Sequence, residues 1–223
     1  MRVSDYIMKR LVEHGIRQVF MITGGGAMHL DDSLGLCKDI KFLCNHHEQA
    51  CAIGAEGYAR MSGKLGVCIV TSGPGGTNTL TGVTGQWTDS VPVLYLSGQI
   101  KFETSIESCR EIGLRQLGDQ EINIIDIVRP ITKFAAMVTK PQEVKKLLDK
   151  AIYIATHGSP GPVWLDIPLN IQGAVIDEKI LLEYNQKEDE INFDKKAIKS
   201  NVKKVIDLLK KRESPIFVSG HGI

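Results

Sequence analysis

Glu48 is the residue of this chain best placed for acid–base chemistry. It stands where an extended apolar run, residues 40–44, gives way to a helix-like stretch, residues 50–60, whose small side chains permit close packing. A carboxylate at such a junction is expected to be buried and to meet a ligand at the edge of a sheet. The alternative is a glutamate that only complements the dipole of a helix N-terminus. Without further motifs, that alternative is favoured.

Two glycine-rich turns follow strand-like runs. The first turn is Thr-Gly-Gly-Gly-Ala at residues 23–27, and the second is Thr-Ser-Gly-Pro-Gly-Gly-Thr-Asn at residues 71–78. Glycine lets the backbone approach a ligand closely and exposes N–H groups at the start of a helix. Neither turn matches Gly-x-Gly-x-x-Gly or the Walker pattern, which disfavours a nucleotide site. Either turn alone could be a plain tight turn, but both together with Glu48 favour a ligand site.

The elements that must position these residues alternate between helix and strand. Strands are expected at residues 18–22, 40–44, 66–71, 93–97, 133–138 and 162–167, with helices at 4–14, 27–36, 48–62, 77–87 and after Pro141. Ser4 is expected to cap the first helix, and Thr139 with Gln142 to form a capping box before the last. This alternation predicts an α/β fold, a parallel sheet with helices on both faces. Both turns and Glu48 then lie at the carboxyl ends of strands, where ligands of such sheets bind.

The character of the sequence changes after residue 170. Residues 177–194 are rich in charge, and residues 195–212 form an amphipathic helical pattern that precedes an expected strand at 216–219. A helix and one strand cannot make a domain. We therefore expect one domain at residues 1–173, a linker at 174–194 and the truncated start of a central α/β domain at 195–223.

Composition excludes several classes of function. Hydrophobic residues make up 43% of the 223 residues and the net charge is +1, so there is no electrostatic case for binding nucleic acid or a membrane. The N-terminus lacks the apolar core of a signal peptide. Five cysteines without Cys-x-x-Cys spacing predict reduced thiols and a cytoplasmic protein. The adjacent His46 and His47 point to opposite faces of an extended segment, so no metal site is expected.

A set of ordered motifs is shared with one known family. The motifs are His-Glu-Gln-Ala at 47–50, Gly-Tyr-Ala-Arg at 57–60, the second glycine-rich turn, Asp-Ser-Val-Pro at 89–92, Gly-Gln at 98–99, Gln-Glu at 120–121, Ile-Thr-Lys at 131–133 and Gly-Pro-Val-Trp-Leu-Asp-Ile-Pro at 161–168. As a set they are highly specific. Over about residues 1–170 the chain resembles the pyrimidine-binding domain of acetolactate synthase and its thiamine-diphosphate-dependent relatives.

The resemblance implies that this is a fragment of a 2-oxo acid decarboxylase or carboligase similar to the acetolactate synthase large subunit. In that family the glutamate matching Glu48 hydrogen-bonds N1′ of the aminopyrimidine ring. The bond favours the imino tautomer, whose nitrogen removes the thiazolium C2 proton. A desolvated carboxyl group suits this role because it can share a proton with a weakly basic nitrogen.

Further site residues carry over from the family by position. Pro74 and Asn78 match residues that line the pyrimidine pocket. Gly26 and Ala27 match the loop that faces the cofactor of the partner subunit. Gln120 matches a glutamine near the reacting centre, although an ordinary glutamine at a helix start accounts for it equally well.

The resemblance also implies partners that this sequence does not itself hold. Family members are much longer, and Mg²⁺ and the diphosphate are held by a C-terminal domain whose metal-binding motif is not in this sequence. FAD, which acetolactate synthases bind mostly through the central domain, is allowed in the full-length protein. The substrates are a small 2-oxo acid and an acceptor. The active site of the family lies between two subunits, so a homodimer or homotetramer is expected, and the isolated fragment is expected to be inactive.

The chain departs from acetolactate synthases where the acceptor would bind. Those enzymes usually read Gly-Tyr-Pro-Gly-Gly-Ala at the first turn, and they place phenylalanine where Asp119 stands here. A polar acceptor fits Asp119 better, and relatives that transfer a two-carbon unit from pyruvate to a keto-sugar share similar Gly-Gly-Gly-Ala-Met-His and Asn-His-His-Glu-Gln runs. Two other classes stay open: a non-catalytic domain that has kept the fold, and a nucleotide-binding oxidoreductase.

Overall fold

The computed structural model of the chain describes residues 1–220. The chain divides into two units, Met1–Asn185 and Gln186–Ile223. The first unit contains all the sheet-forming segments of the described residues and both glycine-rich turns. It therefore contains the candidate site.

The first unit is built on a parallel sheet. Among the described residues the sheet has six strands in the order β2-β1-β3-β4-β6-β5, and every neighbouring pair is parallel. The strands are β1 (Gln18–Met21), β2 (Lys41–Cys44), β3 (Gly66–Val70), β4 (Val93–Gln99), β5 (Phe134–Met137) and β6 (Val163–Pro168). The predicted α/β fold with a parallel sheet is confirmed, and the carboxyl ends of all these strands lie along one edge.

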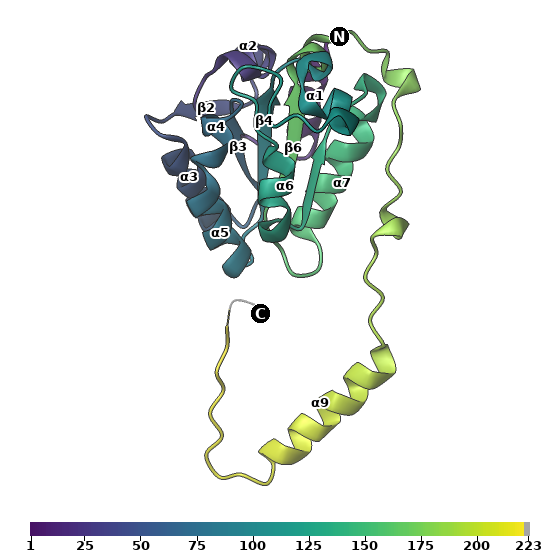
Figure 1. The fold of residues 1–223 in the computed structure, drawn as a ribbon. Coiled ribbons are helices and arrows are strands. Elements are labelled where there is room, and N and C mark those ends of the chain that lie inside the picture. The colour runs from purple at the N-terminus through teal and green to yellow at the C-terminus, as the bar shows by residue number, and fades with distance from the viewer. Residues whose placement is uncertain (221–223) are drawn as a thin grey trace. The chain divides into compact units, whose positions relative to one another are not determined.

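Helices cover both faces of this sheet (Figure 1). One face packs against α1 (Val3–Glu13), α2 (Met28–Leu36), α7 (Val144–Thr156) and α8 (Leu169–Gly173). The other face packs against α3 (Glu48–Ser62), α5 (Leu80–Thr88) and α6 (Ile124–Val128). Because successive side chains of a strand point to opposite faces, a strand buried on both sides reads as a continuous apolar run. In β4, Leu94 and Leu96 enter the first core, whereas Val93 and Tyr95 enter the second.

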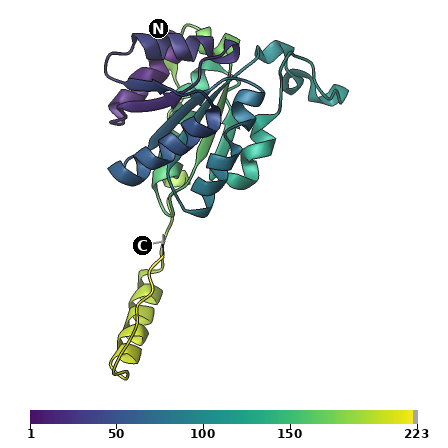
Figure 2. The same ribbon diagram turned by 90° about the vertical axis from the view of Figure 1, so that its left-hand side faces the viewer.

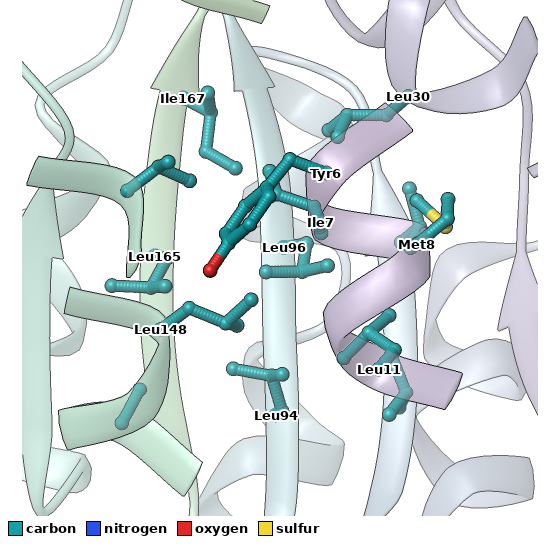
Figure 3. Packing of buried hydrophobic residues seen from close by; sticks show 14 of the residues in the cluster. Tyr6, Ile7, Met8, Leu11, Leu30, Leu94, Leu96, Leu148, Leu165 and Ile167 are labelled. Carbon is teal, nitrogen blue, oxygen red and sulfur yellow. The ribbon is translucent and has the colours of Figure 1, made fainter. Parts of the chain in front are cut away.

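The first core is dominated by aliphatic side chains. Figure 3 shows Tyr6, Ile7 and Leu11 of α1 packed beside the strands β4 and β6, with Leu148 of α7 alongside. Leu11 and Leu148 are fully buried. Side chains of this size contribute about 1.5–3 kcal/mol each when removed from water. This packing fixes the strands whose ends carry the site.

The second core contains a polar network among aromatic rings. The rings of Tyr95 and Trp164, which are paired across β4 and β6, stack with centroids 4.7 Å apart. The Tyr95 hydroxyl donates to Oε1 of the fully buried Gln86 at 2.8 Å, and Nε2 of Gln86 donates to the carbonyl of Ala52 at 3.0 Å. This network ties α5 to α3, whose first residue is Glu48.

Helix starts differ from the sequence prediction in two places. The first helix begins at Val3, and the carboxylate of Asp5 accepts the backbone N–H of Arg2 at 3.0 Å. Ser4 is buried and accepts the hydroxyl proton of Ser33, so it is not the cap. The Thr139 hydroxyl donates to Glu143, and a short 3-10 turn (Pro141–Glu143) precedes α7, so the predicted capping box with Gln142 is also wrong. In both places another side chain binds the hydroxyl that was expected to cap the helix: Ser33 binds Ser4, and Glu143 binds Thr139.

The second unit contains α9 (Lys195–Leu209). Asp194 begins this helix by accepting the backbone N–H groups of Lys196 and Ala197. Five of the six apolar side chains expected on one face are 44–59% exposed, and Leu209 is less exposed. Residues 216–219 are extended but form no strand, so that prediction is wrong. A strand requires a hydrogen-bonded neighbour, and the described residues provide none there. Residues 221–223 of the predicted third segment lie outside the described residues, and the domain boundaries stay a prediction.

No helix among residues 1–220 is both long enough and apolar enough to cross a membrane.

Candidate functional site

The carboxyl ends of three adjacent strands bring both glycine-rich turns and Glu48 together. β1 lies between β2 and β3 in the sheet, and the first turn, which follows β1, extends past the end of β3 and reaches Gly98 of β4. Two side-chain hydrogen bonds join these segments. Gly26 N–H donates to Oγ1 of Thr71 at 3.0 Å, and Nδ2 of Asn78 donates to Oε2 of Glu48 at 2.9 Å.

Glu48 is the first residue of α3. The preceding residue, His47, is the N-cap, and its Nδ1 accepts the backbone N–H of Gln49 at 3.1 Å. Asn78 occupies Oε2 of Glu48, whereas no donor among the described residues contacts Oε1. A Cβ atom added at the buried Gly75 would lie 2.7 Å from Cγ2 of Thr71 and 3.9 Å from Oε1 of Glu48, so this glycine packs against Thr71 close to the free oxygen. The carboxylate is thus fixed on one side and available on the other.

Glu48 is half-buried, so the prediction of a buried carboxyl is wrong for this chain on its own. The cause is its position next to β2, the edge strand of the sheet. Phe42 and Leu43 of that strand are 47% and 50% exposed, and nothing in the described residues covers them. The orientation toward the ligand edge is as expected, but the shielding is incomplete.

Pro74 and Asn78 lie on the second turn and are both exposed. The helix predicted at residues 77–87 is split into a single turn, α4 (Pro74–Thr77), and α5. Asn78 lies between them, next to the buried Thr79, whose hydroxyl bonds back to the carbonyl of Gly76 at 2.7 Å. Both residues keep helical backbone angles, and the Asn78 side chain reaches Glu48.

The first turn packs directly on the second turn. A Cβ atom on Gly24 would come within 2.4 Å of Cβ of Thr71, and one on Gly26 within 2.7 Å of Oγ of Ser72. Only glycine fits such a close approach. Ala27 is fully buried at the end of a short 3-10 turn (Gly25–Ala27), and its N–H donates to the carbonyl of Gly24 at 2.9 Å. The structure therefore places Gly26 and Ala27 beside the second turn.

The backbone carbonyl of Gln120 also lies against the second turn, at Gly73. A Cβ atom on Gly73, whose φ is +60°, would lie 2.5 Å from the carbonyl oxygen of Gln120. Gln120 is exposed and has a φ of +56°, an uncommon conformation for a residue with a side chain. The following helix, α6, begins only at Ile124 with Asn123 as its cap, so the interpretation of Gln120 as a helix-start residue is wrong.

The segment that carries Gln120 is held at both ends. Figure 2 shows this segment, residues 100–122, as the teal excursion that extends away from the sheet between β4 and α6. The buried Gln99 accepts the N–H of Ile100 at 3.1 Å and donates to the carbonyl of Ile122 at 3.1 Å. Glu121 accepts three backbone N–H groups inside the excursion, from Ile106, Leu117 and Gly118.

A buried carboxyl group lies beneath this excursion. Asp166 of β6 is fully buried, and it accepts the Ser97 hydroxyl at 2.6 Å and Nε2 of Gln99 at 3.0 Å. Burial raises the pKa of Asp166 to about 7, although the bonds from Ser97 and Gln99 oppose the shift. The sequence motif contains Asp166, but its contact with Gln99 could not be read from the sequence.

Two further titratable groups near the site were missed in the sequence. Oδ2 of Asp31 accepts the N–H of Gly24 at 3.1 Å, whereas Oδ1 is buried without a partner among the described residues. Burial raises the pKa of Asp31 to about 6. Cys51, one turn after Glu48, has a pKa lowered to about 7 chiefly by a hydrogen bond with the Cys68 thiol. All five cysteines are free thiols.

Comparison with known proteins identifies similar sequences. Residues 1–125 match the family described as thiamine pyrophosphate enzyme, N-terminal TPP binding domain. The chain is 32% identical over 220 residues to the acetolactate synthase large subunit of Buchnera aphidicola subsp. Schizaphis graminum, covering 99% of this chain and 37% of that protein. It is 35% identical over 226 residues to a probable acetolactate synthase large subunit of Methanocaldococcus jannaschii, covering 100% of this chain and 36% of that protein.

A plant relative matches a shorter part of the chain. The chloroplastic acetolactate synthase of Arabidopsis thaliana is 37% identical over 169 residues, which is 76% of this chain and 24% of that protein. The chain therefore spans between about a quarter and little more than a third of the length of these curated relatives.

Proposed function

The chain belongs to the thiamine pyrophosphate enzyme family, and from this premise we propose that it forms the pyrimidine-binding domain of an enzyme that decarboxylates a 2-oxo acid and joins the remaining fragment to an acceptor. One observation carries the proposal. The carboxylate of Glu48 is fixed by Asn78 on one oxygen and open on the other, at the ligand edge of the sheet. The names of the relatives in the comparisons support an activity like that of acetolactate synthase.

Thiamine diphosphate and thiamine pyrophosphate are two names for one cofactor. The residues at this edge fit its aminopyrimidine ring. The ring needs an acceptor for a hydrogen bond from a ring nitrogen, and Oε1 of Glu48 is free to accept it. The exposed Pro74 offers an apolar surface for the ring. When bound, thiamine diphosphate supplies the electron sink for decarboxylation.

The chain's own residues then have distinct tasks. Glu48 holds a proton at the ring nitrogen and Asn78 keeps the carboxylate oriented. The first glycine-rich turn, with Gly26 and Ala27, faces the cofactor of a partner subunit, and Gln120 lies near the reacting centre. The close packing of the first turn on Thr71, and the contact between Gln120 and Gly73, support this assignment.

Other parts of the enzyme would complete the site. We propose that Mg²⁺ and the diphosphate are bound by another domain, because the chain spans only 37% of its Buchnera relative. A homodimer or homotetramer would bring that domain of one subunit to Glu48 of the other and would cover the half-exposed carboxylate. Binding of FAD and a cytoplasmic location, which the free cysteines support, complete the proposal.

Replacement of Glu48 in the whole enzyme tests the function. We expect Glu48→Gln to lower thiamine-diphosphate-dependent decarboxylation of pyruvate by about 100-fold or more, because an amide cannot hold the proton. The matched control is Glu56→Gln in the same helix, where the side chain pairs with Arg60 and not with the site. Turnover of the Glu48 variant within about threefold of the control would refute the catalytic role.

A keto-sugar acceptor is a second candidate for the same chemistry. The observation that favours it is the exposed Asp119, which adjoins Gln120 and can hydrogen-bond a hydroxylated acceptor. The enzyme should be assayed with pyruvate alone and with pyruvate plus keto-sugars. Efficient formation of acetolactate from pyruvate alone would count against the keto-sugar.

A further inference from the structure

The carbonyl oxygen of Gly26 lies in a narrow socket formed by two residues distant in the sequence. Nε2 of Gln172 donates to this oxygen at 2.7 Å, across a separation of 146 residues. On the other side, a Cβ atom on Gly98 would lie only 2.1 Å from the same oxygen. We call Gly98 and Gln172 the Gly26 socket.

Every polar group of the Gln172 side chain is used. Nε2 donates its second proton to the carbonyl of Ile167 at 2.7 Å, and Oε1 accepts the N–H of Leu30 at 3.4 Å. Gln172 is fully buried. A buried amide left without a partner costs about 1–3 kcal/mol. The side chain is therefore satisfied only when the end of β6, the first turn and the start of α2 hold these relative positions.

The N–H group of the same glycine is also fixed. Gly26 N–H donates to Oγ1 of Thr71 in the second turn at 3.0 Å. The turn thus cannot move toward or away from the second turn without breaking a bond to Thr71 or to Gln172. Both bonds are partly buried, and together they restrain Gly26 from two sides.

We propose that Gln172 is a positioning residue of the active site, which acts by fixing Gly26 and Ala27 against the second glycine-rich turn. The inference rests on the proposed function, in which this turn faces the cofactor of a partner subunit. It adds a residue from α8, beyond the motifs that resemble the family. Gln172 does not touch the reacting atoms itself; the turn transmits its effect.

Two variants of Gln172 test whether it positions the first turn or supports the fold in general. Gln172→Met keeps a similar volume and removes all three bonds, whereas Gln172→Glu places carboxylate oxygen against the carbonyls of Gly26 and Ile167. The control is Gln142→Glu, since Gln142 is exposed and its side chain lies outside the socket. The methionine variant keeps the test valid if the glutamate variant does not fold.

The first readout is amide hydrogen exchange in the chain itself. We expect exchange at residues 24–30 to accelerate about tenfold or more in Gln172→Met, while exchange in β3 and β4 stays within about threefold of the parent. The control should match the parent throughout. Unchanged exchange at residues 24–30 overturns the proposal, and so does an equal acceleration throughout the sheet, which would indicate general support of the fold.

The second readout is turnover of the whole enzyme at saturating thiamine diphosphate. We expect Gln172→Met to lower turnover about tenfold at a temperature where it is fully folded, because small displacements of positioning groups have large effects on rate. Faster exchange with unchanged turnover overturns the positioning role. If the parent enzyme shows no thiamine-diphosphate-dependent turnover, the proposed function fails, and the exchange data still decide whether Gln172 holds the turn.

Discussion

Asn78 and Glu48 are joined by a 2.9 Å hydrogen bond, in which the amide donates to one carboxylate oxygen and leaves the other open. The two residues come from different elements, Asn78 from the break between α4 and α5, and Glu48 from the start of α3. A charge-assisted bond of this kind restricts the direction of the carboxylate. The orientation of the acid therefore depends on a residue of the second glycine-rich turn.

Removal of the amide tests this dependence. We expect Asn78→Ala in the whole enzyme to lower turnover about tenfold, since a hydrogen bond to a charged group contributes about 1.5–3 kcal/mol and only part of this is specific to the reaction. Thr84→Ala on the exposed side of α5 is a control. Steady-state kinetics with pyruvate measures the effect. Equal turnover of the two variants would show that Asn78 does not orient Glu48.

Gly98→Ala is expected to destabilise the fold. The added Cβ atom would meet the Gly26 carbonyl at 2.1 Å, a backbone contact that cannot relax by rotation of a side chain. We expect a loss of about 3 kcal/mol or more, at the upper end for overpacking. Gly57→Ala in α3 is the matched control, because nothing lies within 4 Å of its Cβ and alanine raises helix propensity by up to about 1 kcal/mol.

Urea unfolding of the two glycine variants measures these effects. The midpoint of Gly98→Ala should fall and that of Gly57→Ala should rise slightly or stay unchanged. A Gly98→Ala protein as stable as the parent would mean that the first turn is free to move away from β4.

Asp166 is expected to make stability depend on pH. Its pKa is raised by burial from 3.8 to about 7 in the folded chain, so the folded state binds a proton that the unfolded state has released. The contribution to stability is complete below about pH 4 and is lost as the pH rises toward 7, at up to about 1.4 kcal/mol per pH unit. In Asp166→Asn the loss of stability with rising pH should disappear, because the asparagine side chain cannot ionise.

Urea unfolding at several pH values between 4.5 and 7.5 checks this prediction. The free energy of unfolding of the parent should fall more steeply with pH than that of Asp166→Asn. The exposed Asp39→Asn should keep the parental slope. Identical slopes for the parent and Asp166→Asn would show that Asp166 is ionised throughout this range in the folded chain.

Because Tyr95 and Gln86 share a buried hydrogen bond, we expect the effects of replacing them on the free energy of unfolding to be coupled. Gln86→Leu leaves the Tyr95 hydroxyl and the Ala52 carbonyl without their partner, at a cost of about 2 kcal/mol or more. Tyr95→Phe should then cost less in the Gln86→Leu background than in the parent. A double-mutant cycle measures this difference by denaturant unfolding. Strict additivity would contradict a direct bond.

Much of the architecture could be predicted because its signals are local. The apolar runs of the buried strands and the glycine breaks after them lie within a few residues of each other, and they place Glu48 and both turns at one edge. The acid–base role of Glu48 could be predicted from its carboxylate and the motifs that flank it. The edge position of β2 could not be read from its apolar run, and this position leaves Glu48 half exposed.

The residues that sequence reasoning missed act over long separations. Gln172 reaches Gly26 across 146 residues, and Gln99 reaches Asp166 across 67. No periodicity or motif encodes such pairs, because they depend on which strands are neighbours. The wrong cap at Ser4 has a similar cause, since Ser4 bonds to Ser33 of α2 rather than to its own helix. The expected strand at 216–219 has the propensity of a strand and no neighbour to pair with.

The parallel direction of all six described strands also matters for handling the protein. The connections that enter the strands, residues 14–17, 63–65, 89–92 and 157–162, lie at the edge opposite Glu48. Fluorophores, affinity tags or surface-immobilisation handles at the exposed positions of these connections, residues 14–15, 63–64 and 157–159, would therefore lie far from Glu48. The connections after β1, β2, β3 and β4 should carry no label, because they lie at the edge where we propose that the cofactor binds.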